Sequence, residues 1–390
     1  MNIQQTGMLM LLKSAFDQKK YDIPEEFDLK EAIAAAYSHQ ITALVYYGAV
    51  NCGFDSGTPE MQQLFYKVCH DISLNEQQLH AVSVIGGLFD KNDIDYMPVK
   101  GAVIKKLYPK TEMRSMSDID ILIRMEQYDK IKDIMTNLQY KFLQESSHEF
   151  IWKKGAVNVE FHKCLVSSRN TAFYKYLGDG WDFAEKNLGN CYTMRSEDLY
   201  IYLFIHLVKH YRAAGIGIKH VLDLWVYRNS QTLDFGYIEK ILRKLELKEF
   251  HDNINVLLEV WFENKESDEK TDFITNVIFN SGAYGTEEKA LLANIAKLAE
   301  SGKNIKSAGF KRFLFIIFLP YENMKIKYPV LNKIPALLPV FWIKRGFDSI
   351  LKKRGNIKKY INTIEKNNIS KAEEYNEALA YVGLNLRDKK

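Results

Sequence analysis

The chain has 390 residues, which is enough for two or three domains at roughly 100–200 residues each. Because 47% of the residues are hydrophobic and 26% are charged, the composition excludes a disordered or collagen-like protein. The formal net charge of +4 is too small for a protein that coats nucleic acid, although residues 303–359 hold fourteen Lys and Arg against two acids, a local charge of +12.

The cysteines and the apolar runs indicate where the protein resides. The four cysteines, at positions 52, 69, 164 and 191, form no Cys-x-x-Cys pair and no zinc-binding spacing, as is typical of thiols in a reducing compartment. The apolar run Met8–Leu12 follows no basic segment and ends at Lys13, so it is not a signal peptide. The longest apolar run, Phe313–Leu319, is far shorter than the roughly 20 residues that cross a bilayer. We therefore expect a cytoplasmic protein without a transmembrane segment.

Residues 1–93 are expected to form a helical N-terminal region. Apolar residues recur at three- and four-residue spacing over Leu29–Val50 and Met61–Phe89, which is the period of a helix with one buried face. The stretch Gly53–Pro59 between them is rich in turn-forming residues and predicts a connector.

Residues 94–166 have the pattern of a small sheet domain. Ile94–Val99 predicts a strand, Lys100 and Gly101 a turn, and Ala102–Tyr108 a helix. A second strand, an amphipathic helix and three short strands are expected at Ile119–Ile123, Glu126–Leu138, Tyr140–Leu143, Glu149–Lys153 and Val157–Phe161.

The remainder is predicted to be helical, as one region over 167–300 and a basic C-terminal region over 301–390. No proline occurs between Pro109 and Pro320, so no residue there forces a helix to stop. The expected helices are Glu197–Arg212, Ile218–Asn229, Tyr237–Leu245, Phe250–Asn264 and Glu287–Ser301. The fold class is therefore α+β, a small mixed sheet flanked by mainly helical N- and C-terminal regions.

Two carboxylates share one face of the strand Ile119–Ile123. Side chains alternate along a strand, so Asp118 and Asp120 point to one side while the isoleucines between them fill the other. Two neighbouring carboxylates repel each other and gain nothing from burial, but a divalent cation between them removes the repulsion. Oxygen ligands alone favour Mg²⁺ or Mn²⁺. An Asp-x-Asp pair by itself is also common on the polar face of an edge strand.

The later strand Val157–Phe161 adds a third acid. Glu160 lies on the polar face with His162, opposite Val159 and Phe161. If this strand neighbours the first, Glu160 joins Asp118 and Asp120, and three carboxylates are enough to hold two metal ions for phosphoryl transfer.

The turn after the first strand is a predicted phosphate site. A helix that begins at Gly101 offers free backbone N–H groups and partial positive charge, and Lys100 adds a mobile cation. Arg114 is suited to a bidentate phosphate contact.

Several short motifs occur along the chain in an order that resembles a known family. They are Pro98-Val99-Lys100-Gly101, Tyr108-Pro109, Arg114, Asp118-Ile119-Asp120-Ile121-Leu122-Ile123, Glu160-Phe161-His162, His206-Leu207-Val208-Lys209-His210, Asp223-Leu224, Leu319-Pro320, Tyr328-Pro329 and Leu338-Pro339. The chain is similar to an uncharacterised bacterial nucleotidyltransferase family within the polymerase-beta-like superfamily. It departs from the superfamily in having Lys-Gly for the usual Gly-Ser turn and Glu160 for the third carboxylate, commonly Asp.

The resemblance implies a Mg²⁺-dependent (or Mn²⁺-dependent) enzyme that moves a nucleoside monophosphate from an NTP to an acceptor and releases pyrophosphate. Asp118, Asp120 and Glu160 would be catalytic and would bind the metal. The nucleotide would contact Lys100, Gly101, Arg114 and His162. The acceptor stays open between a small molecule, a protein hydroxyl and an RNA. The alternative is a catalytically inactive protein of the same fold that senses a nucleotide or serves in an assembly.

Two further features allow more than one interpretation. His206 and His210 are four residues apart on one predicted helix face, which suits either packing or a place in the site. In the tract 303–359, basic residues mix with Phe310, Phe313, Phe315, Phe318, Tyr321, Tyr328, Phe341 and Trp342. The tract is either an RNA-binding or anionic-membrane surface or, as the helical spacing of the aromatic residues favours, a helical domain with a solvated basic face.

Overall fold

The computed structural model describes residues 1–168, 170–283, 328–344 and 367–385, with a few positions between 285 and 325. The chain divides into two compact units. The first comprises residues 1–286, 382–384 and 388–390, and the second comprises 287–381 and 385–387. The sheet and every residue discussed below as part of a site belong to the first unit.

Four helices precede the sheet: α1 (Ile3–Asp17), α2 (Leu29–His39), α3 (Thr42–Cys52) and α4 (Pro59–Lys91). The stretch Leu29–Val50, predicted to be helical, forms two helices, because the chain breaks between α2 and α3. Gln40 takes a left-handed conformation with φ 57°, and its N–H caps α2 by donating to the carbonyls of Ala36 and Tyr37. Glutamine is a good helix former, so the apolar period gives no sign of this break.

The sheet has five strands in the order β1-β2-β5-β4-β3. They are β1 (Tyr96–Pro98), β2 (Ile119–Ile123), β3 (Lys141–Glu145), β4 (Glu149–Lys154) and β5 (Val157–His162). Strands β2 and β5 are parallel, whereas β1–β2, β4–β5 and β3–β4 are antiparallel. The predicted fold class, α+β with a small mixed sheet and helical flanks, is confirmed.

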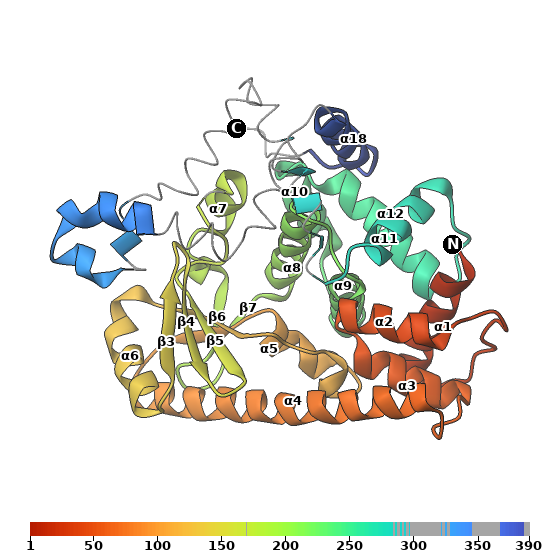
Figure 1. Cartoon of the computed structure of the whole chain (residues 1–390), viewed down its shortest axis with the longest axis horizontal. Helices are drawn as coiled ribbons and strands as arrows, with labels where there is room; N and C mark the ends of the chain where they lie inside the picture. Colours follow the sequence, from red (N-terminus) through yellow and green to blue (C-terminus); the bar gives the residue numbers. More distant parts are fainter. Residues whose placement is uncertain are drawn as a thin grey trace. The chain divides into compact units, whose positions relative to one another are not determined.

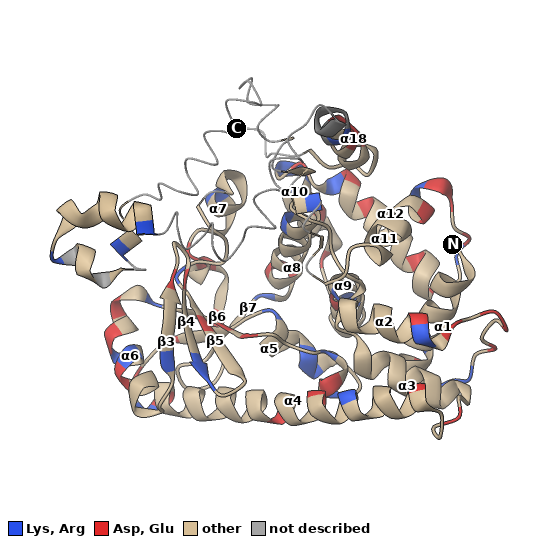
Figure 2. Ribbon diagram, in the orientation of Figure 1, with Lys and Arg blue, Asp and Glu red and all other residues tan. Residues whose placement is uncertain are grey.

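Short helices connect the strands. Helix α5 (Gly101–Ile104) follows β1 and continues as a 3-10 turn over Lys105–Leu107, so the helix predicted at Ala102–Tyr108 is only partly α-helical. Helix α6 (Tyr128–Asn137) follows β2, and Figure 2 shows acidic and basic residues mixed along it.

One face of the sheet packs on α4 and α6. The isoleucines of β2 and the apolar residues of β5 form a buried cluster with Ile85 and Phe89 of α4 and with Ile131 and Met135 of α6. Figure 1 shows α4 running beneath the sheet at one end and beneath α3 at the other. Because the apolar face is covered in this way, the acidic face of β2 and β5 is turned to the opposite side.

The chain after the sheet is mainly helical. A short helix and a two-stranded hairpin, α7 (Thr171–Leu177) with β6 (Ala184–Lys186) and β7 (Tyr192–Met194), were not predicted. Helices α8 (Ser196–Tyr211), α9 (Ile218–Ser230), α10 (Phe235–Lys244) and α11 (Lys248–Phe262) lie close to their predicted bounds, and α12 (Glu269–Phe279) was not predicted. Helix α8 is buried over most of its length and packs on α9 and α10 (Figure 1).

The second unit is described only in part. It contains two 3-10 turns, Pro329–Asn332 and Pro335–Leu337, and the helix α18 (Asn367–Tyr381). The rings of Tyr328 and Phe341 lie 4.6 Å apart, centroid to centroid. Most of the basic tract 303–359 and most of the helix predicted at 287–301 lie outside the described residues, so both interpretations of that tract stay predictions. No helix in the described parts of the chain has both the length and the apolar character needed to cross a bilayer.

Candidate active site

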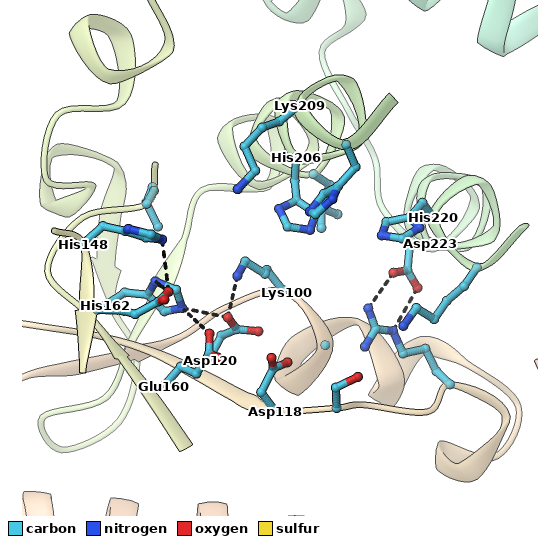
Figure 3. Close-up of a pocket in the computed structure, with 18 residues that line it drawn as sticks. Lys100, Asp118, Asp120, His148, Glu160, His162, His206, Lys209, His220 and Asp223 are labelled. Carbon is cyan, nitrogen blue, oxygen red and sulfur yellow. Dashed lines mark hydrogen bonds and ion pairs between the residues drawn. The ribbon is translucent and has the colours of Figure 1, made fainter. Parts of the chain in front are cut away.

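A cavity of about 230 Å³ lies over the acidic face of the sheet. Its sheet side is lined by residues from β2, β4, β5 and the start of α5, and its other side by residues from α8 and α9 (Figure 3). Parallel pairing sets Asp120 directly opposite Glu160, and Asp118 stands just before β2. The structure therefore brings Asp118, Asp120 and Glu160 to one cavity.

Asp120 is a deeply buried carboxylate with two close partners. It is 3% exposed, and its Oδ1 accepts hydrogen bonds from Lys100 Nζ at 2.5 Å and from His162 Nε2 at 2.7 Å. Burial acts to raise the pKa of Asp120, but the Lys100 ammonium and the His162 hydrogen bond overcome this and hold the pKa below its usual range. Asp120 is thus stable as an anion inside the protein.

Asp118 and Glu160 are in the opposite electrostatic situation. Burial and the charge of Asp120 raise the pKa of Asp118. Burial, Asp118 and Asp120 raise the pKa of Glu160 to about 8. These carboxylates repel one another as the sequence predicts, and a divalent cation would relieve the repulsion.

The donor set fits an oxygen-liganded cation. Ligand atoms of Asp120, Glu160 and His162 all lie within 4.8 Å of one another, and Asp118 lines the same cavity. Carboxylate oxygens are the ligands that Mg²⁺ and Mn²⁺ prefer. The Lys100 ammonium already sits on Asp120 Oδ1, so a cation there has to share Asp120 with it.

Lys100 has a backbone conformation that is uncommon for a residue with a side chain. Its φ is 49° and its ψ is −123°, at the junction between β1 and α5. Its carbonyl accepts from the N–H groups of Val103 and Ile104, which starts α5. Such strained residues persist only where the surroundings hold them, and they concentrate at functional sites. From this position the Lys100 side chain reaches Asp120.

Arg114 is bound to a carboxylate, not turned freely to the cavity. Its Nε donates to Asp223 Oδ1 at 3.1 Å and its Nη2 to Asp223 Oδ2 at 2.7 Å, and Asp223 also accepts from the Tyr108 hydroxyl. This buried ion pair joins the loop before β2 to α9. It also explains Gly101, because a Cβ there would lie 2.3 Å from Arg114 Nη1. The glycine makes room for the arginine.

His162 extends the polar network along β5 and β4. Its Nε2 lies 3.8 Å from Glu160 Oε2, and its Nδ1 lies 4.0 Å from Glu149 Oε2, which in turn contacts His148 Nε2 at 3.1 Å. Burial and the neighbouring Lys100 lower the pKa of His162, which therefore donates one N–H to Asp120 as a neutral ring. His162 holds Asp120 in place.

The opposite side of the cavity is formed by α8 and α9. His206, Lys209 and His210 share one face of α8, and His220 faces them from α9 (Figure 3). We refer to these four residues as the histidine–lysine wall. The ring centroids of His206 and His210 lie 4.5 Å apart, and those of His210 and His220 lie 5.6 Å apart. His206 and His210, whose role the sequence left open, line the cavity.

Several cavity residues were not singled out as site residues in the sequence. These are His148, Glu149, Lys209, Lys219, His220 and Asp223. A signal exists for one of them: Lys209 is three residues after His206 in an otherwise apolar helix, so polar residues at 206, 209 and 210 mark a single face. The others come from distant elements, and local spacing gives no sign of them.

The sheet thus carries Asp118 just before β2, Asp120 on β2 and Glu160 on the parallel neighbour β5. A family described as "Uncharacterised nucleotidyltransferase" matches residues 25–263, which include every residue that lines the cavity. The chain belongs to this family, and the predicted family is confirmed.

Comparison with solved structures gives a distant similarity. The solution structure of the antibiotic-resistance factor ANT(2'')-Ia is 13% identical, with a TM-score of 0.34, over 49% of this chain and 100% of that chain. A comparison with curated proteins found no match.

Proposed function

We propose that the protein transfers a nucleoside monophosphate from an NTP to an acceptor hydroxyl and releases pyrophosphate. The observation that carries this proposal is the parallel register of β2 and β5, which pairs Asp120 with Glu160 beside Asp118 at an open cavity. Membership of a nucleotidyltransferase family supports the reaction class.

In the proposed reaction Asp118, Asp120 and Glu160 hold divalent cations, Mg²⁺ or Mn²⁺. Cations bound there supply charge neutralisation at the attacking and leaving oxygens of an in-line displacement. Glu160 accepts the proton of the acceptor hydroxyl. His162 and Lys100 keep Asp120 ionised and fixed in orientation, because both donate to its Oδ1.

The predicted nucleotide contacts of Lys100, Gly101, Arg114 and His162 stay part of the proposal with one condition. Lys100 and His162 are bound to Asp120, and Arg114 is bound to Asp223. A phosphate contact by these side chains therefore requires each to share a carboxylate that it already holds.

The test measures which molecules receive the α- or the γ-phosphate of the NTP. The full chain is incubated with each NTP, labelled at the α- or the γ-phosphate, with Mg²⁺ and fractions of a cell lysate that separate small molecules, proteins and RNA. We expect the α-label to enter one fraction while the γ-label leaves as pyrophosphate. Entry of the γ-label would indicate phosphoryl transfer and contradict the proposal.

Two variants control this experiment. Asp118→Asn should abolish labelling, and Asp129→Asn, an exposed acid on α6, should leave it unchanged. Equal loss in both variants would mean that labelling depends on overall charge, and undiminished labelling in both would mean that it comes from a contaminating enzyme.

A second candidate is supported by one observation. The Lys100 ammonium occupies Asp120 Oδ1, where a catalytic metal would bind. A protein that senses a nucleotide without transferring it would tolerate such an internal cation. Under this alternative, NTP binds to the full chain but no α-label enters any fraction, whereas an RNA-modifying enzyme would label the RNA fraction.

A further inference from the structure

The histidine–lysine wall carries polar atoms that the protein does not use for its own structure. Among the residues that the structure describes, Lys209 makes no hydrogen bond or ion pair, and the ring nitrogens of His206 and His210 make no hydrogen bond. His220 Nδ1 is buried without a hydrogen-bond partner, in a residue that is 9% exposed. Buried polar groups normally have partners, so His220 Nδ1 points to a ligand, and the partly buried His206, Lys209 and His210 line the same cavity.

The cations on the sheet side differ from Lys209. Lys100 is bound to Asp120, and Arg114 is bound to Asp223 through two hydrogen bonds. Figure 3 shows the Lys209 side chain directed into the cavity, from α8 towards the side that carries Lys100. Of the three, Lys209 alone has no carboxylate partner in the described part of the chain, so it can accept an anion without breaking an ion pair.

We propose that the histidine–lysine wall is the subsite for the pyrophosphate portion of the NTP, with Lys209 as its principal cation. This inference rests on the proposed function and identifies where the leaving group is held. It assigns the β- and γ-phosphates to α8 and α9, opposite the carboxylates of β2 and β5.

The chemistry of the wall favours an anion over a transition metal. Burial and the charges of Lys209 and Lys100 contribute to lowering the pKa of His210, so the ring is neutral and offers one N–H donor. Burial and Lys100 also lower the pKa of Lys209. A bound anion would raise the pKa values of His210 and Lys209 again. Among the described residues, the ligand atoms gathered within 4.8 Å of one another belong to Asp120, Glu160 and His162, not to the wall.

The position suits the reaction. The acceptor oxygen forms a bond to the α-phosphorus, and the bond from that phosphorus to the bridging oxygen of the β-phosphate breaks. The electron pair stays on pyrophosphate, and the acceptor proton goes to Glu160. Negative charge therefore grows on the leaving group, next to Lys209, where a fixed cation stabilises it.

The experiment measures binding of inorganic pyrophosphate to the full chain by titration calorimetry with Mg²⁺. Lys209→Gln should weaken pyrophosphate binding by about 10- to 100-fold, because a charge-assisted contact is lost. The same variant should change AMP binding less than about threefold, since AMP lacks the β- and γ-phosphates. Lys209→Arg should restore part of the affinity.

Matched variants separate this effect from a change in fold or net charge. Lys240→Gln, an exposed lysine on α10, removes the same charge away from the cavity and should bind pyrophosphate as the wild type does. His210→Gln keeps a donor in the wall and should weaken binding by less than Lys209→Gln. Circular dichroism melting of each variant confirms that it is folded; if Lys209→Gln does not fold, Lys209→Arg and His210→Gln decide the outcome.

Three results would overturn the inference. The first is wild-type affinity for pyrophosphate in Lys209→Gln while NTP transfer continues, which leaves the proposed function standing. The second is an equal loss of AMP and pyrophosphate binding. The third is tight Zn²⁺ or Ni²⁺ binding that His206→Gln removes and Lys209→Gln does not. A wild-type chain that binds neither NTP nor pyrophosphate would instead reject the proposed function itself, and with it this subsite.

Discussion

Asp120 on the sheet side of the cavity is held by Lys100 and His162, whereas Lys209 on the helix side has no polar partner among the described residues. The sheet side thus balances its central charge within the protein. The helix side leaves charge and hydrogen-bonding capacity directed at the cavity. Under the proposals above, Asp120 keeps a fixed geometry, while Asp118 and Glu160 receive a cation and the helix side receives the phosphates.

The buried ion pair between Arg114 and Asp223 joins the two sides, and breaking it should have the largest effect. Asp223→Asn leaves the buried Arg114 guanidinium without its anion, which should reduce the free energy of unfolding by about 3–5 kcal/mol. Urea denaturation measures the change. The matched control is Glu263→Gln, which breaks the more exposed pair with Arg228 and should cost less than about 1 kcal/mol. Equal effects would show that the buried pair adds no more stability than the exposed one.

Removing one carboxylate should separate activity from stability. Asp118→Asn should abolish detectable transfer, a loss of at least about 10²-fold, because the divalent cation that would neutralise the developing phosphate charge loses one of its ligands. Its melting temperature in EDTA should stay equal to that of the wild type or rise, since burial and Asp120 raise the pKa of Asp118. Asp120→Asn should lose both activity and stability, because it leaves Lys100 unpaired. A low melting temperature for Asp118→Asn would assign Asp118 a structural role.

The pH dependence of stability should reveal the raised pKa of Glu160. Its folded pKa of about 8 lies above the ordinary value of 4.5, so the folded protein binds the proton more tightly than the unfolded chain. The stability from Glu160 is therefore complete below about pH 4.5 and is lost as the pH rises through about 8. In EDTA, Glu160→Gln should gain about 1–2 kcal/mol over the wild type at pH 9 and nothing at pH 4. A difference that does not change with pH would contradict this assignment.

The smallest effect is expected on the helix side. Lys209→Met should raise the free energy of unfolding by less than the other variants change it, because burial and Lys100 lower the pKa of Lys209. Thermal and urea unfolding measure it, with Lys240→Met as the exposed control. Loss of stability in Lys209→Met alone would show that Lys209 has a structural partner and that the two sides of the cavity do not differ as described.

Local patterns in the sequence were enough for the sheet and its acidic face. The strand at Ile119–Ile123 has the predicted bounds, and alternation along β2 and β5 places the acids on one side, because the period of two residues is a property of the strand itself. The family could be predicted for the same reason, since its motifs are short and lie in order along the chain.

Only the tertiary structure determines which partners the charged side chains of the cavity have. Arg114 and Asp223 are 109 residues apart, so no local pattern reveals the ion pair that the fold makes between them, and the phosphate contact of Arg114 stays a prediction. Gly101 likewise makes room for Arg114, and α8 and α9 complete the cavity from residues that lie forty and more positions beyond β5. The energy of a charge depends on burial and on neighbours within a few ångströms, and only the packing of the whole chain determines both.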